Sequence, residues 1–252
     1  MTRLTGGPGT NSPGQFIGAN VTLRMLLDRA YHLMPWQLAG APLSGDRFDI
    51  AAKIPASATA EQVNLMLQNL LAERFGLVAH RETRDLPIYE AVVAKGGPKL
   101  KTAEKAPPGA PPPPNGRLPR DKDGFLAPPP GVPGMLPSRV NGNDRIAARM
   151  EPLGVLWEYL QRSVLRPIID KTGLTGVYDF NLTYLPDATI QSSPLNIPAL
   201  PAGQAAALEA VRDPAPSLFD ALDRQLGLKL EDKRGPVEVL VVDRVNKAPT
   251  ED

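Results

Sequence analysis

Leu71–Leu77 (LAERFGL) and Leu222–Leu228 (LDRQLGL) are the two stretches that decide the fold. In each stretch, apolar residues with helical spacing are followed by a Gly-Leu pair, and a segment with the pattern of a strand comes next. A glycine just past the last helical turn adopts the left-handed conformation that reverses the chain. The order helix, glycine, strand is therefore predicted twice in this chain of 252 residues.

The similarity between the two regions extends toward the N-terminal side of each stretch. Aligning Gln15–Leu23 with Arg145–Leu153 needs no gap, and it places Phe48–Ile50 on Tyr178–Phe180. Internal similarity of this length is typical of a duplicated structural unit. Short αβ segments also align by chance, so two unrelated halves are the alternative.

The predicted fold class is α+β, with two tandem copies of a strand-helix-strand-helix-strand-strand unit related by a pseudo-two-fold axis. Each copy is expected to place two helices on one face of an antiparallel-rich sheet, with a groove between the copies. The last two strands of each copy are expected to pair with each other. The expected elements are 15–19, 21–34, 46–54, 60–75, 77–83 and 87–94, then 145–150, 152–164, 177–185, 216–226, 228–232 and 236–244.

One helix has a clear start in the sequence. Thr59 and Gln62 have the spacing of a capping box, in which the two side chains satisfy backbone donors at a helix N-terminus. Val63, Met66, Leu67 and Leu70 then fall on one helical face. We therefore expect a helix to begin at about residue 60.

A proline-rich stretch separates the two copies. The chain has 29 prolines, and many of them lie between Pro107 and Pro137. Proline favours polyproline II and loop conformations, so residues 101–143 are predicted to form an extended or mobile connector. The alternatives are plain disorder and an ordered strap or peptide ligand. The predicted domains are a first repeat at 14–100, the connector at 101–143 and a second repeat at 144–247.

Composition argues against several classes of partner. The chain has 28 Lys and Arg against 27 Asp and Glu, so non-specific attraction to nucleic acid is not expected. Cysteine is absent, which removes disulfides and thiolate metal sites. No apolar run is long enough for a membrane span, and the start of the chain does not have the pattern of a signal peptide. Composition leaves the oligomeric state open, and it leaves the localisation open as well.

The familiar signatures of hydrolases and nucleotide-binding enzymes are missing from the sequence. It contains neither a Gly-x-Ser-x-Gly elbow nor a His-Glu-x-x-His motif, and only 2 histidines. A histidine-rich zinc site is therefore excluded. Phosphate-binding and dinucleotide-binding glycine motifs are also missing, so we expect no nucleotide cofactor.

His80 is the candidate general base. It lies in a predicted strand, on the same face as Glu82, which is two positions further along the chain. A neutral imidazole is suited to base catalysis near pH 7, and Glu82 would orient it. The alternative is a solvated strand face, since Glu231 occupies the corresponding position of the second copy.

Three aspartates are candidate calcium ligands. Asp49 and Asp179 occupy matching positions, and apolar neighbours on both sides direct their carboxylates away from the core. If the copies face each other, these two would meet Asp170 and bind a hard cation such as Ca²⁺, which takes several oxygen ligands. The bound ion would polarise a substrate carbonyl. The alternative roles are structural: paired strand aspartates more often cap turns or pair with arginines. Asp170 would accept backbone hydrogen bonds in a turn.

Several segments carry a family resemblance. They are Asn20–Leu23, Leu71–Phe75, His80–Tyr89, Val92–Leu100, Asp170–Gly176 and Pro216–Phe219, together with the region up to Gly235–Glu238. In these segments the chain resembles an uncharacterised, Solibacter-type domain family of soil acidobacteria. That resemblance covers both copies, leaves out the proline-rich connector, and implies an exported or periplasmic protein.

A second similarity is to metagenome-derived hydrolases that open acyl-homoserine lactones with calcium. It implies an ester or lactone hydrolase but supplies no catalytic motif. The catalytic candidates therefore come from the residues themselves: His80 or Asp170 would supply the base, and Glu82 would orient His80. The rival hypothesis is a non-catalytic exported module that binds a ligand or a peptide. Exposed edge strands would serve such a module by strand addition.

Overall fold

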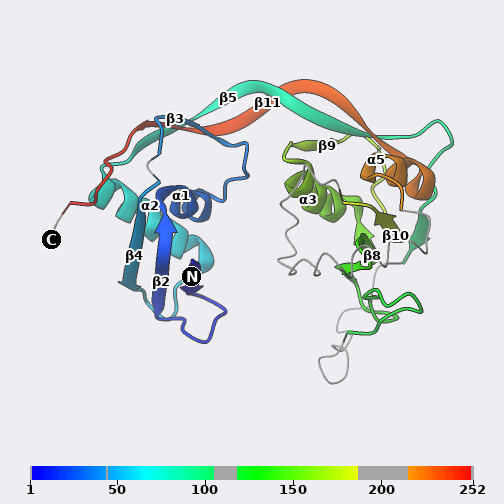
Figure 1. Cartoon of the computed structure of the whole chain (residues 1–252), viewed down its shortest axis with the longest axis horizontal. Coiled ribbons are helices and arrows are strands. Elements are labelled where there is room, and N and C mark those ends of the chain that lie inside the picture. Colours follow the sequence, from blue (N-terminus) through cyan, green and yellow to red (C-terminus); the bar gives the residue numbers. More distant parts are fainter. Residues whose placement is uncertain (1, 44, 105–117, 187–214, 251–252) are drawn as a thin grey trace. The chain divides into compact units, whose positions relative to one another are not determined.

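The computed structural model describes residues 2–43, 45–104, 118–186 and 215–250 (Figure 1). The fold is α+β and consists mostly of strands. The chain forms two compact units: unit 1 is Met1–Leu86 with Pro236–Asp252, and unit 2 is Pro87–Gly235. These units do not follow the boundaries of the predicted repeats, since each contains a segment from the far half of the chain.

Unit 1 contains an antiparallel sheet and two helices. The sheet has the order β1-β2-β4, and the helices α1 and α2 pack against each other. The buried core contains residues from both helices and from the strands. The bounds are β1 Arg3–Gly6, β2 Gln15–Thr22, α1 Leu23–Tyr31, β4 Arg47–Lys53 and α2 Ala60–Phe75.

The predicted signals at both ends of α2 are confirmed. The Thr59 hydroxyl accepts from the Gln62 N–H, and the Gln62 side chain accepts from the Thr59 N–H, which completes the capping box. Gly76 ends the helix with a φ of 56°, in the left-handed region. Helix α2 therefore starts and stops where local sequence places it.

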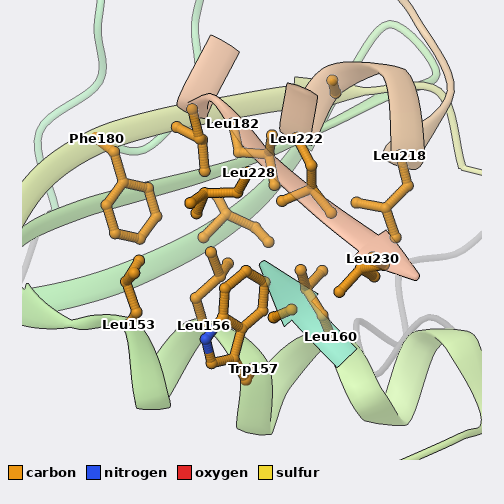
Figure 2. Close-up of a cluster of buried hydrophobic side chains, with 14 of the residues drawn as sticks. Leu153, Leu156, Trp157, Leu160, Phe180, Leu182, Leu218, Leu222, Leu228 and Leu230 are labelled. Atoms are coloured by element: carbon orange, nitrogen blue, oxygen red, sulfur yellow. The ribbon is translucent and has the colours of Figure 1, made fainter. Parts of the chain in front are cut away.

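Unit 2 contains a second antiparallel sheet, with the order β6-β10-β8-β7, and its own helices. Figure 2 shows part of its core, in which Leu156 and Trp157 of α3 lie near Leu222 and Leu228. The bounds are β6 Lys101–Ala103, β7 Gly134–Val140, β8 Asn143–Pro152, α3 Leu153–Val164, β10 Val177–Tyr184, α5 Leu218–Ala221 and the π-helical turn η2 Leu222–Leu226.

The third sheet has the order β3-β11-β5-β9, and its two inner strands are long (Figure 1). Strand β5 runs from Val78 to Val93, and β11 runs from Leu228 to Arg244, so each passes from one unit into the other. The outer strands are short, with β3 at Leu38–Gly40 and β9 at Ile168–Asp170. The predicted pairing of 77–83 with 87–94 was therefore wrong, because these segments form one continuous strand. The same correction applies to 228–232 and 236–244.

Part of the predicted connector is folded. Strand β6 begins at Lys101, and β7 occupies Gly134–Val140. Phe125 is buried, and the guanidinium of Arg145 lies 3.9 Å from the centre of its ring. A connector that is extended or mobile over all of 101–143 is therefore not what the structure shows. Residues 105–117 lie outside the described part of the chain.

In both units, helical segments end at residues with positive φ. Helices α1 and α3 both end at residues with positive φ, 52° at His32 and 53° at Leu165. The later helical segments end at Gly76 and Gly227, with φ values of 56° and 66°. Each of these residues directly follows the last residue of its helical segment.

Candidate functional site

His80 and Asp243 lie next to each other in unit 1, on the neighbouring strands β5 and β11. Nδ1 of His80 is 2.9 Å from Oδ2 of Asp243. An ionised carboxylate only accepts hydrogen bonds, so Nδ1 carries the hydrogen and the neutral ring keeps its lone pair on Nε2. The side chains are 51% and 43% exposed, which leaves the pair accessible to a small molecule.

Glu82 lies on the other side of the His80 ring. Its Oε2 atom is 3.6 Å from Nε2 of His80, beyond the usual hydrogen-bond distance of about 3.2 Å. Arg84 donates a hydrogen bond to the other carboxylate oxygen. Arg84 therefore holds Glu82, and Asp243 is the carboxylate within hydrogen-bond distance of the imidazole.

These neighbours change the protonation of both groups. The hydrogen bond to Asp243 is the largest cause that raises the pKa of His80 above its ordinary value of 6.5, and Glu82 acts in the same direction. The hydrogen bond from Arg84 lowers the pKa of Glu82. A raised imidazole pKa makes His80 a stronger base but reduces its neutral fraction at pH 7.

A further ion pair lies on the same two strands. Arg81 Nη1 donates to the Glu238 carboxylate, and both side chains are exposed. Exposed pairs of this kind contribute little to stability, typically about 0–1 kcal/mol. The Arg81–Glu238 pair is therefore expected to add little to the stability of unit 1.

Asp49 and Asp179 make the same hydrogen bond in their own units. The Asn20 N–H donates to Asp49 Oδ1 at 2.7 Å, and the Met150 N–H donates to Asp179 Oδ1 at 2.9 Å. Asn20 and Met150 have φ values of 54° and 52°, a region that residues other than glycine rarely adopt. The strand register shifts at both places. Each aspartate thus stabilises the backbone where the strand register shifts.

Asp170 connects strand β9 to helix α3. Its Oδ2 atom accepts from the indole N–H of Trp157 at 3.0 Å. Its Oδ1 atom accepts from the backbone N–H and the hydroxyl of Thr172, at 2.8 and 2.7 Å. Trp157 is buried, and its N–H needs a partner for that reason. These contacts give Asp170 the turn-forming role that the sequence left open as an alternative.

The predicted calcium ligands belong to different units. Asp49 lies in unit 1, and Asp170 and Asp179 lie in unit 2. Within the described ranges, no cluster of three or more His, Cys, Asp or Glu side chains is arranged to hold a metal ion. The carboxylate oxygens named above already accept hydrogen bonds within their own unit, so calcium binding stays a prediction from the sequence.

Sequence reasoning missed two polar features. Asp243 was not singled out, because its neighbour His80 lies far away along the chain and their strands were not expected to pair. In unit 2, Arg139 forms a bidentate pair with buried Asp144, whose second contact is 2.8 Å long. Burial raises the pKa of the nearby Tyr159 to about 12 and also raises that of Tyr184. Nothing in the local sequence pattern indicates this cluster.

Fold and site define an α+β protein of two units, with an accessible His-Asp pair on paired strands. The chain belongs to the DUF3738 family, described as a protein of unknown function, whose profile matches residues 24–245. Neither a curated protein nor a solved structure matches the chain. In the part of the chain that the structure describes, no helix is long and apolar enough to cross a membrane.

Proposed function

We propose that this protein hydrolyses small esters or lactones, with His80 as the general base and Asp243 as the carboxylate that orients it. The observation that carries the proposal is the 2.9 Å contact between His80 Nδ1 and Asp243 Oδ2. It fixes the tautomer in which Nε2 accepts a proton. Glu82 supports the base by raising the pKa of His80.

The proposed reaction needs only water as co-substrate. Nε2 of His80 takes a proton from water while the water oxygen attacks the carbonyl carbon. The bond between that carbon and the alkoxy oxygen then breaks, and the imidazolium returns the proton to the leaving oxygen. A lactone yields the ring-opened hydroxy acid, and the histidine is regenerated.

Acyl-homoserine lactones are the specific substrates that we propose. The support for them is the resemblance to metagenome-derived lactone hydrolases, which also brings calcium into the proposal. The ligands of a bound calcium ion would be Asp49, Asp170 and Asp179. The contacts of these aspartates favour structural roles. We therefore assign the catalytic roles to His80 and Asp243, and calcium dependence is tested separately.

The test is product formation on a panel of acyl-homoserine lactones and simple esters, followed by mass spectrometry. The purified protein is assayed with chelator and with added Ca²⁺. We expect ring-opened product, and we expect His80→Gln to abolish it. Product that persists in His80→Gln would remove His80 from the mechanism.

His32→Asn is the matched control for this assay. It changes the other histidine of the chain, which ends helix α1 in the left-handed conformation that asparagine also adopts. Turnover is expected to be unchanged. If chelator abolishes turnover and Ca²⁺ restores it, the three aspartates become ligand candidates; if turnover is indifferent to both, calcium drops out of the proposal.

A non-catalytic exported module is the second candidate, favoured by the outer strands β3 and β9. Strand β9 uses the backbone of Pro167 and Lys171 to bond β5, so the intervening backbone groups of Ile168 and Asp170 point toward the outer edge. Ile169 is 39% exposed beside this edge. Such an edge is suited to adding a peptide strand. Saturable peptide binding without turnover would favour this module.

We also infer that the two units descend from one duplicated element related by a pseudo-two-fold axis. The order of elements from β2 to β5 equals the order from β8 to β11. The Asn20–Asp49 hydrogen bond recurs as Met150–Asp179. A shared hydrogen bond at two left-handed, non-glycine residues supports a duplication over chance similarity of αβ segments. An experimental structure would test the axis.

A further inference from the structure

The two halves of the chain exchange strands. The first half is residues 2–104 and the second half is residues 118–250, as far as the structure describes them. In unit 1, β3 of the first half pairs in parallel with β11 of the second half. In unit 2, β9 of the second half pairs in parallel with β5 of the first half. Each half therefore supplies a strand to the unit built mainly from the other half.

The hydrogen bonds of the two exchanged pairs match. The Leu240 N–H donates to the Gln37 carbonyl, and the Tyr89 N–H donates to the Pro167 carbonyl, both at 2.8 Å. On the other side of each pair, the Ala41 N–H donates to Val242 at 2.7 Å. The corresponding bond of unit 2 runs from the Lys171 N–H to Ala91 at 2.8 Å. The exchange is thus reciprocal.

Exchanged residues also lie inside the cores. Leu240 and Val242 of the second half are buried in the core of unit 1. Ala91 of the first half is fully buried in the core of unit 2, with Tyr89 and Val93 packed against the same cluster. Removing an exchanged strand would leave apolar core surface open to water, which is unfavourable.

The chain that follows each exchanged strand binds the end of a helical segment in the same unit. The Asn246 N–H donates to the Phe75 carbonyl at 2.7 Å, at the end of α2. The Lys99 N–H donates to the Leu226 carbonyl at 2.8 Å, at the end of η2. Unpaired carbonyls at a helix end need such donors. The exchanged segment therefore completes the helix end as well as the sheet.

We infer that each half of the chain binds the other half through the inner edge of its short outer strand. In the first half this strand is β3, which binds β11, and in the second half it is β9, which binds β5. The halves then hold together through these strands without needing the proline-rich connector. This inference does not depend on the proposed hydrolase. It makes the pair of halves, rather than the single repeat, the unit that folds.

Glycines at both exchange contacts allow the close approach. A Cβ atom on Gly40, whose φ is 99°, would lie 2.2 Å from the Val242 carbonyl oxygen. A Cβ atom on Gly227, whose φ is 66°, would lie 2.0 Å from the Gly97 carbonyl oxygen. In each case the glycine and the oxygen belong to different halves, so a side chain there separates the exchanged segments.

The first experiment uses the whole chain with a site-specific protease sequence in place of residues 111–114. The chain has no cysteine, so His80→Cys and Asp243→Cys together introduce one thiol in each half. After oxidation, or after reaction with a short bifunctional thiol reagent, the connector is cut. Denaturing electrophoresis without reductant then shows whether the halves are covalently joined.

We expect one band with the mass of both halves, because the side chains at these two positions are in contact only when β5 and β11 are exchanged. If β11 instead folds back within its own half, the two introduced thiols lie apart and two bands result. Two bands from a chain whose circular dichroism equals that of the unmodified protein would overturn the inference.

The second experiment needs no cysteine. The cut chain is passed over a gel-filtration column at rising denaturant, and the halves are expected to elute together until the protein unfolds. Gly40→Ala is expected to separate them at a lower denaturant concentration. Gly45→Ala is the control, because a Cβ atom there meets no atom within 4 Å. Halves that separate without denaturant, or equal behaviour of the two variants, would contradict the exchange.

Discussion

Nδ1 of His80 lies 2.9 Å from Oδ2 of Asp243, although 163 positions separate the two residues in the chain. Two strands from opposite halves create this contact, and it gives the chain a histidine with a raised pKa in an accessible position.

Asp243→Asn is expected to lower the pKa of His80 toward 6.5. The hydrogen bond to Asp243 is the largest cause of the raised pKa, and an amide does not stabilise the imidazolium as a carboxylate does. The measurement is an NMR titration of the His80 ring protons. Asp232→Asn, a change of an exposed carboxylate in unit 2, is the control. An unchanged His80 pKa in Asp243→Asn would contradict the contact.

Asp243→Asn is also expected to change how turnover by the proposed hydrolase depends on pH. His80 must be neutral to accept a proton, so turnover is expected to rise as pH increases through its raised pKa. In Asp243→Asn this rise is expected at lower pH, with a smaller maximal rate because the ring has lost its orienting acceptor. Initial rates from pH 5 to 9 provide the check. A rise at the same pH in both proteins would argue against His80 as the base.

Asp170→Ala is expected to destabilise unit 2 by about 1–3 kcal/mol, because the buried indole N–H of Trp157 loses its acceptor. Chemical unfolding followed by tryptophan fluorescence measures the effect. The wild-type stability is expected to be the same with chelator and with Ca²⁺. A large stabilisation by Ca²⁺ that Asp170→Ala abolishes would instead support the calcium site.

Asp179→Ala is expected to cost about 1–2 kcal/mol, because the Met150 N–H then loses its partner at a left-handed residue. A second substitution at position 150, to a residue that adopts positive φ easily, should compensate for part of this loss. Met150→Gly in the Asp179→Ala background should recover part of the loss, since glycine adopts positive φ without strain. No loss in Asp179→Ala would remove the structural role.

Asp144→Asn and Asp232→Asn form a pair that compares a buried with an exposed ion pair. The Asp144 side chain is 7% exposed and pairs with Arg139, so the variant is expected to lose about 3–5 kcal/mol. The Asp232 side chain is 77% exposed and pairs with Arg166, and its loss should be about 0–1 kcal/mol. Denaturant midpoints measure both. Equal effects would show that burial does not control these pairs.

Local sequence was sufficient for elements whose signals lie within a few residues. Helix α2 was predicted at 60–75 and is observed at Ala60–Phe75, because its capping box and its terminal glycine are both encoded locally. The same holds for the left-handed Gly76 and Gly227. A helix end requires only neighbours in the chain, so the sequence carries the whole signal.

The sequence identified only some of the residues of the candidate site. His80 was found from strand alternation, and Glu82 lies close to it as expected. Asp243 was missed, since its position depends on which strand lies beside β5. Asp49, Asp170 and Asp179 were found as conspicuous carboxylates, but their backbone and indole partners follow from sheet register and helix packing.

The sequence by itself determined the α+β class and the two ends of α2, which are set by local caps. Only the tertiary structure decided that 77–83 and 87–94 join into one strand. Pro87 and the Gly235-Pro236 pair are compatible with a tight turn as well as with a strand that continues, so local preferences do not separate the two. The continuous strands are selected by partners far along the chain: β3 and β9 bond them, and two separate cores bury their apolar residues.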